Sequence, residues 1–125
     1  MNLIHTNDAP APGGHYSQAA LAGDYLFTAG QVGLDPKSGQ TPSDFREEVR
    51  QSLANLKFVL AEGGAEVTDV VRTMCLLTDI NNFAIFNEEY AKFFGDHKPA
   101  RSTFGIALAG GFTVEVEAIA HVARA

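Results

Sequence analysis

The sequence predicts an α+β fold in which one mixed β-sheet is covered on one face by two helices. Two segments carry apolar residues at the three- and four-residue spacing of amphipathic helices, and they alternate with runs rich in β-branched and aromatic residues. The chain has 125 residues, which suits one hydrophobic core. We therefore expect a single domain over residues 1–125 with the element order ββαβαββ.

The first part of the chain is expected to contain strands and turns. Pro and Gly cluster in residues 9–14, which predicts a loop, and the first convincing strand covers residues 25–29. Gly30 and Gln31 are expected to end or bulge that strand. Residues 34–39 carry Asp, Pro, Ser and Gly in the order of a tight turn, so we expect a β-hairpin there.

The first helix is expected to start near residue 41. Thr41 is the predicted N-cap, Pro42 takes the first helical position and Asp44 lies in the first turn. Gly63 and Gly64 are expected to end the helix. One side of this helix is apolar and packs on the sheet; its residues are Phe45, Val49, Leu53, Leu56 and Leu60.

The second half of the chain adds a helix and three strands. Residues 70–78 are apolar and β-branched with little polarity, which predicts a strand in the middle of the sheet that is buried on both faces. Residues 79–82 offer caps for the second helix, and two last strands near residues 102–109 and 113–122 flank a turn at Gly110 and Gly111. The apolar positions of the second helix are Phe83, Phe86, Tyr90, Phe93 and Phe94.

The last strand alternates between two kinds of side chain. Its small apolar residues, from Val114 to Val122, share one face, whereas Glu115, Glu117, Ile119 and His121 share the other. Two helices cover only one face of the sheet, and no sequence remains to cover the other. We therefore expect a homo-oligomer with its site between subunits.

Composition and charge exclude several classes of function. The formal net charge of −6 and the absence of a basic stripe disfavour binding to nucleic acid or anionic membranes. The N-terminus has no signal-peptide pattern and no segment is apolar enough to cross a membrane, so we expect a cytoplasmic protein. The four histidines lack metal-ligand spacing and the Gly-Gly pairs form no phosphate-binding loop, so we expect neither a metal nor a cofactor.

Two charged residues are candidates for chemistry. Arg101 follows Pro99 and Ala100 where a loop enters a strand, which suits bidentate binding of a carboxylate, although a surface salt bridge is the alternative. Glu117 lies in an otherwise apolar strand and could position or deprotonate water; a solvated strand face is the alternative, with Glu115 as the internal control. The single cysteine, Cys75, is expected to be a buried structural thiol.

Six short stretches with a recognisable pattern are spread over nearly the whole chain. They are Asn7-Asp8-Ala9-Pro10, Tyr16-Ser17-Gln18-Ala19, Phe27-Thr28-Ala29-Gly30-Gln31-Val32, Arg50-Gln51-Ser52-Leu53-Ala54-Asn55-Leu56, Pro99-Ala100-Arg101-Ser102 and Val116-Glu117-Ala118-Ile119-Ala120. Each stretch is weak alone, but their order along the chain is specific. In these stretches the chain resembles the YjgF/RidA family of reactive-intermediate (enamine/imine) deaminases, also known as the endoribonuclease L-PSP family.

The resemblance implies a chorismate-mutase-like subunit that assembles as a homotrimer with three clefts at the interfaces. It implies that Arg101 binds the carboxylate of 2-aminoacrylate and related imino acids, and that Glu117 helps to orient the attacking water. Tyr16, Gly30 and Asn87 match positions that line the family's cleft; their alternative roles are a packed aromatic, a bulge and a helix-surface amide.

The function expected from the resemblance is hydrolysis of 2-imino acids, such as 2-aminoacrylate or 2-iminobutyrate, to 2-keto acids and ammonia without a cofactor. The Thr103 hydroxyl is expected to help position the water. Three features depart from the best-known deaminases: Ala29 and Thr103 replace Ser or Cys, residues 108–112 replace an Arg-Leu-Pro-like turn, and the segment between Phe94 and Pro99 is shorter. One alternative is a non-catalytic protein that binds small carboxylates or has a regulatory role. The other is an RNA-cleaving or translation-inhibiting protein.

Overall fold

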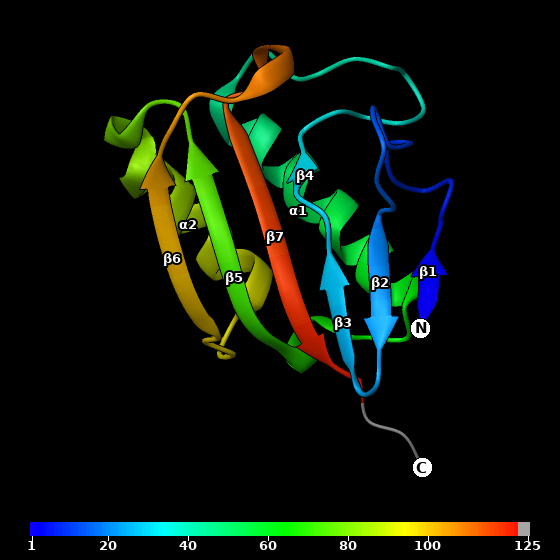
Figure 1. Cartoon of the computed structure of the whole chain (residues 1–125). Helices are drawn as coiled ribbons and strands as arrows, with labels where there is room; N and C mark the ends of the chain where they lie inside the picture. Colours follow the sequence, from blue (N-terminus) through cyan, green and yellow to red (C-terminus); the bar gives the residue numbers. More distant parts are fainter. Residues whose placement is uncertain (123–125) are drawn as a thin grey trace.

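The computed structural model describes residues 1–122 and has the predicted architecture, one mixed sheet with both helices on the same face (Figure 1). Four strands precede the first helix, where the sequence predicted two. The elements are β1 (Asn2–Ile4), β2 (Ala19–Ala22), β3 (Tyr25–Thr28), β4 (Gln31–Val32), α1 (Phe45–Glu62), β5 (Val70–Leu77), α2 (Phe83–Phe94), β6 (Ala100–Gly105) and β7 (Val114–His121), with 3-10 turns at Val67–Asp69, Ile80–Asn82 and Ala109–Gly111.

The strand order in the sheet is β1-β2-β3-β7-β5-β6, and β4 pairs with β7 beyond the end of β3. Only β5 and β6 are parallel, because the crossover through α2 joins them; the other pairs are antiparallel. The last two strands of the chain flank the Gly110 and Gly111 turn as predicted, but β5 lies between them in the sheet. Figure 1 shows β6 at one edge of the sheet and β1 at the other.

The predicted hairpin at residues 34–39 is wrong. These residues do form a turn, in which the Gly39 amide donates to the Asp35 carbonyl at 2.9 Å and the Lys37 amide donates to Asp35 Oδ1 at 2.9 Å. The turn lies in the loop between β4 and α1, so no strand follows it. Turn chemistry predicts a chain reversal but not the elements that flank it. The hairpin forms instead between β2 and β3, around Gly23 with φ +59°.

Helix α1 starts three residues later than predicted at Thr41. Asp44 is the N-cap, and its carboxylate accepts a hydrogen bond from the Glu47 amide at 3.1 Å. Asp44 lies three residues before Glu47, so its carboxylate can satisfy the Glu47 N–H, which has no partner within the helix. Thr41 and Pro42 remain in the preceding loop. The helix ends as predicted at Gly63 and Gly64, and its apolar residues from Val49 to Leu60 form much of the core.

Strand β5 lies inside the sheet, but the prediction that it is buried on both faces is wrong for the single chain. Thr73, Cys75 and Leu77 are buried beneath the helices, whereas the alternate residues Met74 and Leu76 are partly exposed. The cause is that α1 and α2 cover only one side. The predicted apolar face of α2 is confirmed, because Phe86, Tyr90 and Phe94 are buried.

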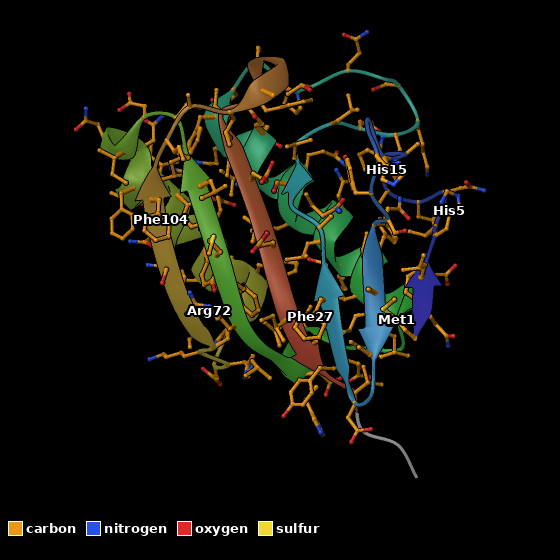
Figure 2. The ribbon with its side chains drawn as sticks, in the orientation of Figure 1. Met1, His5, His15, Phe27, Arg72 and Phe104 are labelled. Carbon is orange, nitrogen blue, oxygen red and sulfur yellow. The ribbon has the colours of Figure 1, made fainter. Side chains whose placement is uncertain are left out.

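The other side of the sheet, which we call the open face, carries the alternate side chains of β3, β5, β6 and β7. The predicted alternation in β7 is confirmed, because its small apolar residues are buried and Glu115, Glu117 and Ile119 are partly exposed. Figure 2 shows Phe27 and Phe104 on the open face, where their side chains are 44% and 48% exposed. No helix within residues 1–122 is long and apolar enough to cross a membrane.

Candidate functional site

Arg101 is the second residue of β6, and the strand register directs its side chain toward the helices. In the parallel β5–β6 pair, Arg101 lies opposite Thr73, which is buried beneath α2. The Arg101 Nη1 atom donates a hydrogen bond to Asn87 Oδ1 of α2 at 2.8 Å. The structure therefore brings together two of the residues predicted to share a site, 14 positions apart in sequence.

Three aromatic rings of α2 surround the Arg101 guanidinium. Its central carbon lies 4.8 Å from the ring centre of Tyr90, 5.4 Å from that of Phe83 and 6.0 Å from that of Phe86. Such cation–π contacts each contribute about 0.5–2 kcal/mol and limit the positions of the cation. Within residues 1–122 Arg101 forms no ion pair, so the salt-bridge alternative finds no partner in the single chain. The guanidinium has further N–H donors available for an external carboxylate.

Thr103 lies on the same side of β6, two residues after Arg101, and pairs in register with Cys75. Its Oγ1 atom is buried and has no hydrogen-bond partner in the described part of the chain. Buried hydroxyls are rarely left in that state, because the lost hydrogen bonds cost about 1–3 kcal/mol. Cys75 beside it is buried, which raises the pKa of its thiol to about 11, so it is not a thiolate at neutral pH.

A pocket of about 400 Å³ opens beside Arg101, and we call it the Arg101 pocket. One wall is a stripe of α2 and the other is the turn that leads into β6. The lining residues are Asn87, Tyr90, Ala91, Phe94, Gly95, His97, Lys98, Pro99 and Arg101. Sequence reasoning missed the turn residues and assigned Tyr90 only to the core, because helical spacing shows which side of α2 faces inward but not what lies beyond its end.

Glu117 lies on the opposite side of the sheet from Arg101. It belongs to the open face of β7, pairs in register with Met74 and is partly buried. Arg101 instead points toward the helices, so one chain does not bring the guanidinium and this carboxylate together. The sequence predicted both residues as parts of one site, and the single chain places them on opposite faces of the sheet.

Gly30 explains the environment of Glu115, the other acidic residue on this part of the open face. Phe27 pairs with Ile119 and Gln31 with Val116, so the five residues 27–31 lie opposite the four residues 116–119 of β7. This extra residue separates β3 from β4 at Gly30, where the sequence predicted that the strand ends or bulges. A Cβ atom at position 30 would overlap the Glu115 carboxyl group. Burial, and secondarily the charge of Glu117, raises the pKa of Glu115 above its usual range.

Tyr16 and Gly30 line a second, smaller pocket of about 140 Å³, together with Phe112. The Tyr16 side chain is 54% exposed, and its hydroxyl accepts a hydrogen bond from the Gly13 amide at 3.1 Å. Tyr16 is therefore not a packed core aromatic, which was the alternative role.

The candidate residues fall into two groups. The arginine half-site contains Arg101, Asn87 and Thr103, and the glutamate half-site contains Glu117, Glu115, Gly30 and Tyr16. The first half-site lies at the β6 edge beneath α2, and the second spans the open face and the loops beyond β3. In the part of the chain that the structure describes, no three His, Cys, Asp or Glu side chains gather as a metal site would require.

Comparisons with known proteins cover nearly the full chain. The family model for endoribonuclease L-PSP matches residues 6–122. A RutC family protein of Pyrococcus horikoshii is 43% identical over 121 residues, which are 95% of this chain and 96% of that protein. The 2-iminobutanoate/2-iminopropanoate deaminase of Rattus norvegicus is 44% identical over 120 residues, 94% of this chain and 88% of that protein. The crystal structure of E. coli TdcF with bound serine aligns with a TM-score of 0.93 at 36% identity and covers 97% of each chain.

Proposed function

The chain belongs to the endoribonuclease L-PSP family, also called the YjgF/RidA family, and from that premise we propose that it is an enzyme that hydrolyses reactive 2-imino acids. The substrates are small imines and enamines such as 2-iminobutyrate or 2-aminoacrylate, and the products are a 2-keto acid and ammonia. The observation that carries this proposal is the Arg101 guanidinium, which Asn87 and three aromatic rings hold at the edge of an open pocket. The deaminase relative and the serine-bound TdcF structure support a ligand of amino-acid type.

Arg101 is proposed to bind the substrate carboxylate. A guanidinium stays charged at any biological pH and offers a planar pair of donors that matches both carboxylate oxygens. Because the hydrogen bond to Asn87 and the aromatic rings restrict its position, the carboxylate would orient the C=N carbon in one direction. The Thr103 hydroxyl, buried and unpaired within residues 1–122, is suitably placed on the same side of β6 to contact the substrate or the attacking water.

We propose further that the protein works as a homotrimer with its sites at the subunit interfaces. Arg101 and Glu117 lie on opposite sides of one sheet, which supports a site completed by a second copy. The open face also exposes large apolar side chains, including Tyr25, Phe27 and Phe104, that contact between copies would bury. In this arrangement the arginine half-site of one subunit faces the glutamate half-site of its neighbour.

The proposed reaction needs no redox step. Glu117 accepts a proton from water as the water oxygen attacks the C=N carbon, which gives a tetrahedral carbinolamine. Glu117 passes that proton to the nitrogen, which completes the carbinolamine. The hydroxyl proton of the carbinolamine then moves through Glu117 to the same nitrogen as the C–N bond breaks and the C=O bond forms, so the products are the 2-keto acid and ammonia. An enamine substrate first takes a proton on its β-carbon and loses one from its nitrogen, and so becomes the imine. The protein's contribution is orientation of the carboxylate and placement of one base near water.

The experiment that tests the proposal measures ammonia release from 2-iminobutyrate generated in situ from an amino acid. Arg101→Ala should lose most of the acceleration, because it removes the carboxylate contact, whereas Lys57→Ala, an exposed cation on α1, should behave as wild type. Circular dichroism checks that both variants keep the fold. Normal turnover by Arg101→Ala would overturn the assignment of Arg101.

Two other outcomes would select the alternative functions. Binding of a 2-keto acid without any turnover of imine would indicate a carboxylate-binding module. RNA cleavage that survives Arg101→Ala would indicate the nuclease activity that gives the family its name. The net charge of −6 weighs against the second outcome.

A further inference from the structure

The Arg101 pocket is larger than the smallest 2-imino acids require. Its volume of about 400 Å³ lies in the range of about 300–1,000 Å³ that is typical of pockets for whole small-molecule ligands. A substrate whose carboxylate binds Arg101 has only its side chain left to enter the pocket, because its C=N carbon must remain accessible to water. A methyl or ethyl side chain would leave most of this space unused.

Apart from Arg101 and Lys98, the polar groups that line the pocket bond to other parts of the protein. The Tyr90 hydroxyl is 2.7 Å from Thr73 Oγ1, and His97 Nε2 is 2.7 Å from the Val70 carbonyl oxygen. Asn87 Oδ1 accepts from Arg101. The remaining surface consists of the Phe94 ring, Ala91, Gly95 and Pro99, together with the charged side chain of Lys98. Most of the lining is therefore apolar and suits a hydrocarbon side chain.

The walls of the pocket are preformed. The Gly95 amide donates to the Ala91 carbonyl at 2.8 Å, which ends α2, and the His97 amide donates to the Phe94 carbonyl at 3.2 Å. The Phe94 ring lies 4.6 Å from the Tyr90 ring and 6.2 Å from the His97 ring, measured between ring centres. A preformed pocket needs little ordering when a side chain enters, so burial of that side chain contributes directly to binding.

We propose that the Arg101 pocket binds the substrate's side chain and selects 2-imino acids with long apolar or aromatic side chains over 2-iminopropanoate. This inference rests on the proposed function, because it assumes that the substrate's carboxylate binds Arg101. Each buried methylene contributes about 0.8 kcal/mol, which corresponds to about a fourfold gain in kcat/KM. The imine of leucine should therefore exceed that of alanine by about tenfold or more.

The test compares kcat/KM for imines generated from alanine, leucine, methionine and phenylalanine. Ala91→Phe places a ring in the pocket and should reduce the leucine-to-alanine ratio by about tenfold. Ala84→Phe is the matched control, because residue 84 is an exposed alanine on the same helix that does not line the pocket. The control should keep the wild-type ratio.

Binding of the corresponding 2-keto acids, measured by calorimetry, gives a readout that does not need turnover. 4-Methyl-2-oxopentanoate should bind more tightly than pyruvate, and Ala91→Phe should reduce that difference. Equal values across the series, in turnover or in binding, would overturn the inference. So would a preference for a second, distal carboxylate that disappears in Lys98→Ala, because it would make the pocket an anion site.

The two proposals fail in different ways. Turnover of all the imines at similar rates would contradict only the side-chain pocket. No turnover of any imine by the wild-type protein would contradict the deaminase function, and the 2-keto acid series would still decide whether the pocket prefers apolar side chains.

Discussion

Replacing Gly30 with Ala should destabilise the protein through one identified contact, the Glu115 carboxyl group. A Cβ atom at position 30 would overlap the end of the Glu115 side chain and lie 2.6 Å from its Cγ atom. Glu115 is partly buried on the open face, so its flexible side chain must turn further toward solvent to make room. Forced overpacking costs about 1–3 kcal/mol, and we expect the low end of that range here. The glycine itself does not need a positive φ, so backbone strain adds nothing.

The same substitution in a Glu115→Ala background has the opposite expected sign. The overlapping atoms are then gone, and Gly→Ala at an ordinary backbone position stabilises by about 0.4–1 kcal/mol through the unfolded chain. The four proteins form a double-mutant cycle, measured by urea denaturation at one protein concentration. Equal costs of Gly30→Ala in both backgrounds would refute the argument that Glu115 requires a glycine at this position.

Three further predictions concern elements outside the site. Asp44→Ala should destabilise α1 by about 0.5–2 kcal/mol while Thr41→Ala changes little, and urea denaturation of the two variants tests which residue caps the helix. Hydrogen bonds from Arg50, and next from Arg46, lower the pKa of Glu89 from its ordinary 4.5 to about 2. The ionised carboxylate therefore stabilises the fold fully above about pH 4.5. That stabilisation is lost as the pH falls toward 2. Glu89→Gln should be less stable than wild type at pH 7, and its stability should fall less steeply between pH 4.5 and pH 2. A pH profile of the unfolding midpoint identical to that of wild type would contradict this. Cys75 should resist a thiol reagent at pH 8 in the native protein, because its thiol is buried and has a pKa of about 11. It should react at once in 6 M urea. Rapid labelling of the folded protein would contradict its burial.

Both helices could be predicted from sequence because their apolar spacing is a property of the helix itself. The position of the α1 cap was not predictable in the same way. Thr41 and Asp44 are both good N-cap residues, and the choice depends on where the loop from β4 meets the core. The hairpin failed for a related reason, since residues 34–39 have strong turn chemistry but the pairing partner is decided by the rest of the sheet.

The candidate site divides into a predictable and an unpredictable part. Alternation along β7 was enough to separate Glu117 from the core side. The side to which Arg101 points depends on the β5–β6 register, which a sequence does not show. Its contacts with Asn87 and Tyr90 join residues of different elements, so they also required the structure. The catalytic roles of Arg101 and Glu117 stay predictions until the variants are assayed.

The placement of Arg101 and Glu117 on opposite sides of one sheet has a genetic consequence. If neighbouring subunits each supply half of a site, two inactive variants can rescue each other when they share a trimer. At a mixed interface, an Arg101→Ala subunit contributes an intact glutamate and a Glu117→Gln subunit contributes an intact arginine. Random mixing of equal amounts would restore about one quarter of the sites. Co-expressing the two alleles should therefore recover activity that neither allele has alone.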